Sequence, residues 1–181
     1  MKKRPCLESA RLLLRPFDID DAADVRELAG HRDVASTTLL VPHPYEDGMA
    51  EQWISTHQER FDRRELSVFA IIRRSEQSLI GAIDLTIESD HQRAALGYWI
   101  GRPHWGHGYC TEAAQLVLRY GFGDLGLNRI AAQHLSRNPA SGRVLEKAGM
   151  QHEGRLRRHV KKWGVFEDVE CYAVLKSEFQ P

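Results

Sequence analysis

Apolar and polar residues follow two different periods along the chain, and these periods predict a sheet covered by helices. In residues 79–88, apolar Ile83, Leu85 and Ile87 alternate with polar positions, which is the period of a half-buried strand. In residues 109–122 the apolar positions recur at helical spacing instead. The predicted strands are residues 7–15, 66–73, 79–88, 93–100, 129–136, 151–162 and 165–176, and the predicted helices are residues 18–29, 49–63, 109–122 and 138–149. This mixture indicates an α+β (α/β layered) fold, with a mixed sheet and helices on its faces.

The chain is expected to form one folding unit. No repeat, low-complexity tract or linker rich in Gly, Ser or Pro divides the 181 residues, so we expect a single domain over residues 1–181. With 42% hydrophobic and 28% charged residues, the composition is that of a globular protein rather than a disordered or membrane protein. The basic start is followed by an apolar run of only Leu12 to Leu14, so we expect mature sequence rather than a signal peptide.

Charge and cysteine usage narrow the classes of partner. Twenty-five Lys and Arg residues balance twenty-five Asp and Glu residues, so any anion site must be local. Cys6, Cys110 and Cys171 are odd in number and widely spaced, which argues against a disulfide framework and favours a reducing cytoplasm. The basic stretch "RLRRHVKKW" precedes acidic "FEDVE", which favours a solvated edge, or the rim of a phosphate site, over nucleic-acid binding. We therefore expect no nucleic-acid or membrane partner, and a monomer or homodimer.

A glycine loop, "WGHGYC" at residues 105–110, lies between a predicted strand and a predicted helix. Backbone N–H groups at such a helix start are unpaired and lie at the positive end of the helix dipole, where a phosphate binds. A dinucleotide fingerprint is disfavoured because GxGxxG fails at Thr111, and the GK pair that a P-loop requires is missing. A tight turn that needs glycine only for its geometry is the alternative.

A second segment, "NPASGRVLEKAGM" at residues 138–150, has the signals of a well-delimited helix. Asn138 suits the N-cap, Pro139 suits the first helical position, and the final glycine suits the C-terminal cap. Stepping back three and four residues from Val144 and Leu145 places Ser141 on the inward face, in the first turn. A serine there either bonds back to its own helix or faces a site.

Together, "YWIGRPHWGHGYCTEA", "NPASGRVLEKAGM" and "KKWGVFEDVECYAVL" resemble the GNAT superfamily of acetyl-CoA-dependent N-acetyltransferases. Within it the chain is most similar to the ribosomal-protein N-terminal (alanine/serine) acetyltransferases, and the likeness runs from "ESARLLLRPF" to "YAVLKSEF". The resemblance implies a mostly antiparallel central sheet splayed between its fourth and fifth strands. It also implies that the pantetheine arm of acetyl-CoA lies in that split.

The same resemblance implies a set of acetyl-CoA contacts. The superfamily's pyrophosphate motif puts Trp105 first, Gly108 fourth and Cys110 last, and both Trp105 and Cys110 depart from its usual residues. Backbone amides of residues 106–111 would hold the pyrophosphate, Asn138 would meet the pantetheine, and Ser141 would lie near the sulfur. Arg102 and Arg143 are expected beside the adenosine phosphates. The expected acetyl-CoA contacts are Tyr98, Trp99, Ile100, Trp105, Gly106, His107, Gly108, Tyr109, Cys110, Thr111, Asn138, Ser141 and Arg143.

Acetyl transfer to an amine requires a neutral amine, correct placement, donors to the developing oxyanion and a proton for the thiolate. Backbone N–H groups of residues 97–100 are the candidates for the oxyanion. Ser141 is the candidate proton donor, and a serine that merely caps its helix is the alternative. The candidates for the general base are Asp84, Glu88 and His134, and a water chain would also serve.

Two further motifs are assigned no chemistry. His104 and His107 are spaced like part of a metal site but lack a third ligand nearby, so no metal is expected. Cys110 lacks an apparent base, which argues against a covalent acyl intermediate.

The expected function is therefore transfer of an acetyl group from acetyl-CoA to a primary amine, by direct attack in a ternary complex. The expected acceptor is the α-amino group of a protein or peptide N-terminus, as the resemblance implies. Two alternatives stay open: the same chemistry on a small amine, such as a polyamine, an amino acid or an antibiotic, and an acyl-CoA-binding module without catalysis.

Overall fold

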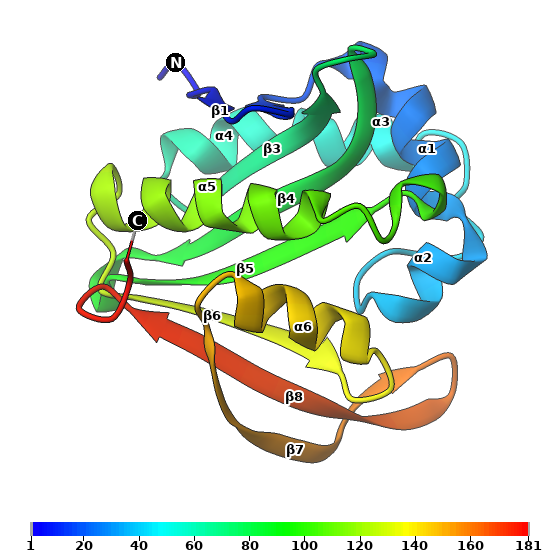
Figure 1. Ribbon diagram of the computed structural model, residues 1–181. Helices are drawn as coiled ribbons and strands as arrows, with labels where there is room; N and C mark the ends of the chain where they lie inside the picture. Colours follow the sequence, from blue (N-terminus) through cyan, green and yellow to red (C-terminus); the bar gives the residue numbers. More distant parts are fainter. Residues whose placement is uncertain (1, 181) are drawn as a thin grey trace.

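Eight strands form one open sheet in the order β1-β2-β3-β4-β5-β6-β8-β7, and only β5 and β6 are paired in parallel (Figure 1). The computed structural model describes residues 2–180. The strands are β1 (Leu7–Glu8), β2 (Leu12–Arg15), β3 (Leu66–Arg73), β4 (Ser78–Glu88), β5 (Arg93–Ile100), β6 (Arg129–Leu135), β7 (Gln151–Lys162) and β8 (Val165–Leu175). The helices are α1 (Ala22–Gly30), α2 (Arg32–Thr37), α3 (Met49–Ser55), α4 (His57–Asp62), α5 (Tyr109–Gly123) and α6 (Pro139–Lys147). Short 3₁₀ turns are η1 (Ile19–Asp21), η2 (Ser89–His91) and η3 (Arg102–His104).

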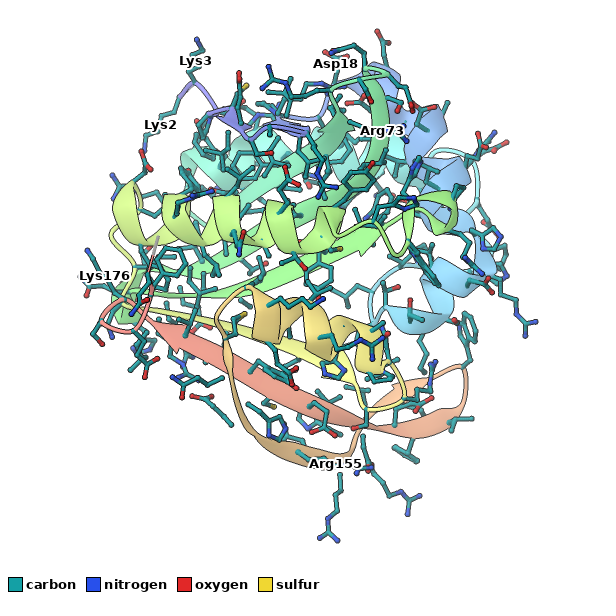
Figure 2. All side chains as sticks on the ribbon, viewed as in Figure 1. Lys2, Lys3, Asp18, Arg73, Arg155 and Lys176 are labelled. Atoms are coloured by element: carbon teal, nitrogen blue, oxygen red, sulfur yellow. The ribbon has the colours of Figure 1, made fainter. Side chains whose placement is uncertain are left out.

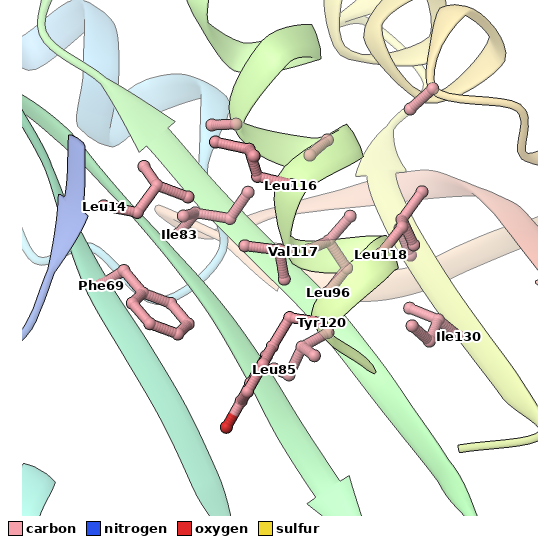
Figure 3. Close-up of a cluster of buried hydrophobic side chains, with 14 of the residues drawn as sticks. Leu14, Phe69, Ile83, Leu85, Leu96, Leu116, Val117, Leu118, Tyr120 and Ile130 are labelled. Carbon is pink, nitrogen blue, oxygen red and sulfur yellow. The ribbon is translucent and has the colours of Figure 1, made fainter. Parts of the chain in front are cut away.

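Helices cover both faces of this sheet, which confirms the predicted fold class. Helices α5 and α6 lie on one face, and α1, α3 and α4 lie on the other (Figure 1). Side chains such as Phe69, Ile83 and Leu85 point to the α5 side and form the larger core (Figure 3). Val68 and Ala82 belong to the second core, on the α1 side. Because both faces are covered, β3 is buried along nearly its whole length.

Two predicted elements are divided in the structure and one short helix was not predicted, each for a local reason. The predicted strand 7–15 is divided, because Ser9 forms a turn whose N–H donates to the Leu12 carbonyl. The predicted helix 49–63 breaks at Thr56, where the Ser55 and Thr56 hydroxyls donate to carbonyls three residues earlier. Helix α2 was not predicted, since its six residues are too few to show a period.

The sheet splays between β5 and β6, as the resemblance implied. These strands pair only over four positions, from Arg93 with Arg129 to Leu96 with Ala132. Beyond them, the Gly97 to Ile100 part of β5 has no strand partner on its β6 side. The splayed strands are the fourth and fifth of the predicted set, because β1 and β2 were predicted as one strand.

Helix α6 has the predicted termini with one difference. Gly149 adopts φ +93°, and the N–H groups of Gly149 and Met150 donate to the carbonyls of Glu146 and Leu145, which is a Schellman cap. Pro139 occupies the first turn as predicted. Asn138 is at the N-cap, but its side chain makes no capping hydrogen bond. That amide is therefore available to the cleft that it lines.

Candidate active site

A cleft of about 730 Å³ opens at the splay. Its walls come from the unpaired ends of β5 and β6, the first turns of α5 and α6, and the segment from α2 to Val41. All the expected acetyl-CoA contacts except His107 line this cleft. His107 does not line the cleft, and its carbonyl accepts a hydrogen bond from Arg11 Nη1 at 3.0 Å.

The glycine loop presents bare backbone at the start of α5. Gly106 and Gly108 adopt φ +81° and +78°, a conformation that L side chains rarely take, so glycine is needed here for geometry. The loop also fits an anion: a Cβ at Gly106 would meet no atom within 4 Å, and one at Gly108 would meet only Arg11 Nη2, at 3.7 Å. The open space lies over N–H groups at the positive end of the α5 dipole.

Two residues that the sequence did not reveal hold this loop in place. Arg11 donates to Glu112 Oε2 at 2.7 Å and to the His107 carbonyl, and its guanidinium lies 4.8 Å from the centre of the Tyr109 ring. Glu112 also accepts from the Ser9 hydroxyl at 2.6 Å. These contacts join the β1–β2 turn to the first turn of α5, about a hundred residues away in the chain.

Of the two residues that depart from the superfamily's pyrophosphate motif, Trp105 has a local structural role. The Trp105 indole Nε1 donates to the Ile100 carbonyl at 2.7 Å, and so closes the loop onto the end of β5. Arg102 lies over the Trp105 ring and pairs with Asp33, and it is not among the residues that line the cleft. Burial raises the pKa of the Cys110 thiol to about 12, which argues further against Cys110 as a nucleophile.

Tyr98 and Ser141 meet in the cleft on the α6 side of the sheet. Tyr98 Oη lies 2.6 Å from Ser141 Oγ and 3.2 Å from the Ser141 carbonyl oxygen. Burial raises the pKa of Tyr98, the nearby Cys110 thiol adds to the rise, and the bond to Ser141 opposes it. The phenol therefore stays protonated, and the pair is a source of one proton inside the cleft.

Asp84 lies on the opposite face of the sheet from Tyr98. It is paired in register with Gly97, and a Cβ at Gly97 would lie 2.8 Å from Asp84 Oδ1, so the glycine makes room for the carboxyl group. Burial raises the pKa of Asp84 to about 7, and a hydrogen bond from Thr86, 3.3 Å long, opposes this rise. A carboxyl group with this pKa is suited to exchange protons near neutrality.

The other two candidate bases are in different surroundings. Glu88 is exposed and does not line the cleft, and its bonds to Arg93 lower its pKa, so of the two candidates on this strand only Asp84 lies at the cleft. His134 lines the cleft but is buried under α6, on the opposite face from Asp84. Its Nδ1 donates to the Leu135 carbonyl at 2.9 Å, and its Nε2 has no partner in residues 2–180.

The segment after α2 forms the wall of the cleft on the Asp84 side, which the sequence did not reveal. Val34, Thr37 and residues 38–41 line the cleft, and Leu40 is 94% exposed at its rim. Lys162, which is only 8% exposed, donates to the carbonyls of Leu39 and Val41 at 3.4 and 3.1 Å. The β7–β8 hairpin therefore holds this wall.

Two observations concern the part of the chain that the structure describes. Within residues 2–180, no three His, Cys, Asp or Glu side chains come together as metal ligands would. None of the helices in the same range is both long and apolar enough to span a membrane.

Comparisons with known proteins agree with this geometry. Residues 11–151 match the family described as acetyltransferase (GNAT) domain. The probable N-acetyltransferase YjcK of Bacillus subtilis (strain 168) is 35% identical over 178 residues, which is 95% of this chain and 98% of that protein. The ribosomal-protein-serine acetyltransferase of Escherichia coli (strain K12) is 30% identical over 99 residues, which is 54% of this chain and 55% of that protein.

A solved structure extends the match to three dimensions. The crystal structure of an acetyltransferase (GNAT family) from Bacillus anthracis aligns with a TM-score of 0.85 at 28% identity, covering 96% of this chain and 100% of that one. The chain therefore belongs to the GNAT family and is an N-acetyltransferase, a type of enzyme that takes its acetyl group from acetyl-CoA.

Proposed function

We propose that this enzyme acetylates the α-amino group of a protein or peptide N-terminus, by direct attack in a ternary complex. The similarity to a ribosomal-protein-serine acetyltransferase supports a protein acceptor. The observation on which the proposal rests is the charge of the cleft, because the GNAT fold by itself is compatible with many amines.

Among the described residues that line the cleft, Asp84 is the only one with a carboxyl group, and the wall on its side, residues 37–41, is neutral. A polyamine keeps further ammonium groups after one amine has reacted, and each would need a counter-charge in a confined site. A peptide N-terminus brings one amine followed by neutral backbone. The cleft therefore fits the peptide better than the polyamine.

The α-amino group also suits the proposed base. Its ordinary pKa is about 7.7–8.0, so a substantial fraction is neutral near physiological pH. Asp84, with its pKa raised to about 7, then accepts the proton that the amine loses on attack. A lysine side chain, with an ordinary pKa of about 10.4, would be deprotonated far less often.

The remaining groups lie on the other side of β5. When bound, acetyl-CoA supplies an activated acetyl group and a thiolate leaving group. Backbone N–H groups of residues 97–100 are our candidates to donate to the acetyl oxygen, since β5 has no β6 partner there. Ser141 delivers its hydroxyl proton to the thiolate as the carbon–sulfur bond breaks, the Tyr98 hydroxyl, 2.6 Å away, passes a proton to Ser141, and solvent reprotonates Tyr98 in the same relay. Base and acid thus act from opposite faces of the sheet.

Release of CoA, measured over a panel of amines, tests this proposal. The panel contains peptides beginning with Ser or Ala, the same peptides with a blocked N-terminus and an internal lysine, polyamines, free amino acids and aminoglycosides. Turnover with the free peptides and not with the blocked ones supports the proposal. Exclusive turnover of a small amine contradicts it, and CoA binding without any turnover would favour a non-catalytic binding module.

A further inference from the structure

The start of α5 carries an acidic side chain of its own, that of Glu112 in the first turn. Partial burial would raise the pKa of Glu112, but hydrogen bonds from Ser9 and Arg11 outweigh it and hold the pKa below its ordinary value. The carboxyl group is therefore ionised near neutrality. The positive end of the helix dipole attracts this carboxylate, and it attracts a diphosphate in the same way. If the glycine loop holds the diphosphate of CoA as proposed, two anions share one helix end.

Arg11 neutralises Glu112 from outside the cleft. Its Nε donates to Glu112 Oε2 at 2.7 Å, its Nη2 lies 2.5 Å from the same oxygen, and its backbone N–H donates to Glu112 Oε1 at 3.3 Å. Arg11 is not among the residues that line the cleft. Helix α5 lies between the β1–β2 turn, which carries Arg11, and α6, which contributes to the cleft (Figure 1). Arg11 therefore reaches the start of α5 from the side that faces away from α6.

The guanidinium of Arg11 is held against the glycine loop. Besides its bonds to Glu112, it donates to the His107 carbonyl at 3.0 Å and lies 4.8 Å from the centre of the Tyr109 ring. A Cβ at Gly108 would lie 3.7 Å from its Nη2. A guanidinium has five N–H groups, and three of them are used by Glu112 and His107. Within residues 2–180, two donors are left beside the loop, on a group whose position is already fixed.

The loop itself supplies no such positive charge. Residues 103–111 contain neither lysine nor arginine, and the single side-chain donor of Trp105 is used by a β5 carbonyl. Arg102 covers the Trp105 ring and pairs with a carboxylate on α2. Arg73, at the end of β3 (Figure 2), pairs with a carboxylate in the β3–β4 turn. Arg11 differs from these two cations because it bonds both to the backbone of the loop and to the first turn of α5.

We infer that Arg11 is a positioning residue for acetyl-CoA, which cancels the charge of Glu112 at the start of α5 so that the diphosphate binds there. This role rests on the proposed diphosphate site at the glycine loop, and it does not depend on which amine is the acceptor. The Glu112 side chain is only 19% exposed, so its charge is weakly screened by solvent and would repel a diphosphate if it were uncompensated. With Arg11 in place the pair is neutral, and the N–H groups of the loop keep their attraction for phosphate.

A purely mechanical role of the pair is the alternative. The same contacts join the β1–β2 turn to α5, and the Ser9 hydroxyl adds to them by donating to Glu112 Oε1 at 2.6 Å. If the pair only fixed the shape of the loop, loss of either partner would weaken CoA binding. If the pair balances charge, the two losses act differently: removal of Arg11 weakens CoA binding, whereas removal of the Glu112 charge does not.

Calorimetric titration with CoA separates these two roles, and urea unfolding of each variant checks its fold. Arg11→Ala should raise the Kd for CoA about tenfold, because it leaves an unpaired carboxylate at the helix end that binds phosphate. Glu112→Gln keeps the shape of the side chain and an acceptor oxygen for Ser9, and it should bind CoA at least as tightly as the native protein. Arg11→Ala combined with Glu112→Gln should return the Kd to within about threefold of the native value, although the ion pair is lost.

Two further variants and a second ligand serve as controls. Arg11→Lys keeps the positive charge without the planar fork, and should bind CoA within about threefold of the native protein. Arg74→Ala removes a donor to the Ser9 carbonyl and an ion pair with Glu8 at the same turn, and should leave CoA binding unchanged. Dephospho-CoA keeps the diphosphate but lacks the 3′-phosphate, and its affinity for Arg11→Ala should fall by the same factor as that of CoA.

Each result decides the role of Arg11. A double variant that binds CoA as weakly as Arg11→Ala, or weakened binding by Glu112→Gln, would show a mechanical pair and overturn the inference. Native affinity in Arg11→Ala would also overturn it, and a loss seen with CoA but not with dephospho-CoA would assign Arg11 to the 3′-phosphate instead. No CoA binding by the native protein would overturn the cofactor site and the inference together. Acetylation of a small amine in place of a peptide would contradict the proposed function alone.

Discussion

Tyr98 Oη and Ser141 Oγ lie 2.6 Å apart across the splay, one on β5 and the other in the first turn of α6. Because Gly97 precedes Tyr98 on β5 and opposes Asp84, the hydroxyl pair and the carboxyl group reach the same cleft from opposite faces. The end of β5–β6 pairing at Leu96 exposes this part of β5 to the cleft.

Loss of the hydroxyl pair should slow the chemical step. Ser141→Ala is expected to lower kcat about 10²-fold, within the usual contribution of a positioned proton donor, with little change in the KM for acetyl-CoA. Tyr98→Phe should give a smaller loss, since Ser141 can still be reprotonated by water. Steady-state CoA release measures both, with exposed Ser89→Ala as the control. Unchanged kcat in Ser141→Ala would remove the proposed role and leave a serine that only packs at the helix start.

Ionisation of Asp84 should determine how kcat/KM rises with pH on the acidic side of its pH profile. With its pKa at about 7, activity should rise with pH through this value as the carboxylate forms. Asp84→Asn should lower kcat/KM by about 10²-fold or more and remove this limb. A retained limb in the variant would assign the base to another group or to water.

The same substitution should stabilise the fold. The folded-state pKa of Asp84 is raised from its ordinary 3.8 to about 7, so the folded state binds more protons and stability falls as pH rises between these values. Asp84→Asn removes this loss, so its Tm should exceed that of the native protein above the Asp84 pKa. Below about pH 3.8 the two values should converge, because the carboxyl group is then protonated and neutral in both the folded and the unfolded state. If Asp84→Asn and the native protein had equal Tm values at every pH, burial could not be the cause of the raised Asp84 pKa.

His57 should make the protein sensitive to mild acid. It is packed between Trp53 and Phe17, neither ring nitrogen has a partner within residues 2–180, and burial with Arg4 and Arg60 lowers its pKa from 6.5 to about 4. The unfolded chain therefore binds a proton first as pH falls below 6.5, and stability is lost from there down to about pH 4.

Urea unfolding across this pH range measures the effect of His57. His57→Phe keeps a ring in the core and should flatten the acid decline, whereas exposed His91→Gln should not change it. An identical decline in His57→Phe would show that other groups cause it.

Gly108 should be needed both for the turn and for the cofactor. At φ +78°, Gly108→Ala places a residue in the left-handed region at a cost of about 1–2 kcal/mol, and it should also weaken CoA binding. Asn adopts the left-handed conformation more readily than Ala. Gly108→Asn therefore separates the effect of backbone strain from the effect of a side chain that covers the loop N–H groups. Calorimetric titration with CoA and urea unfolding measure the two effects. Gly123→Ala, at the end of α5 with open space around it, is the control. Native CoA affinity in both Gly108 variants would contradict the pyrophosphate assignment.

Where a part of the site lies within a single stretch of the chain, the sequence of that stretch predicted it. The glycine loop, the ends of α6 and the inward position of Ser141 follow from turn chemistry and helical spacing, and the structure has all three. Asp84 and Glu88 could not be separated in this way, because both lie on the polar side of one strand. Only the register of β4 with β5 sets Asp84 against Gly97 and Glu88 against Arg93.

Contacts between segments that are far apart in the chain could not be predicted from the sequence. Arg11 reaches Glu112 across about a hundred residues, and Lys162 reaches Val41 across 121. No local sequence pattern predicts either pair, because the two partners come together only when the whole sheet has formed. The break between α3 and α4 is different, because the hydroxyl groups of Ser55 and Thr56 were visible but equally compatible with an unbroken helix.

A direct competition tests the central claim, namely the identity of the acceptor. The enzyme is given acetyl-CoA with equal concentrations of spermidine and a Ser-initiated peptide that contains one internal lysine, and the products are identified by mass spectrometry. The account predicts acetyl on the peptide α-amino group, with the lysine and spermidine largely unmodified. Acetyl found predominantly on spermidine or on the lysine side chain would contradict it.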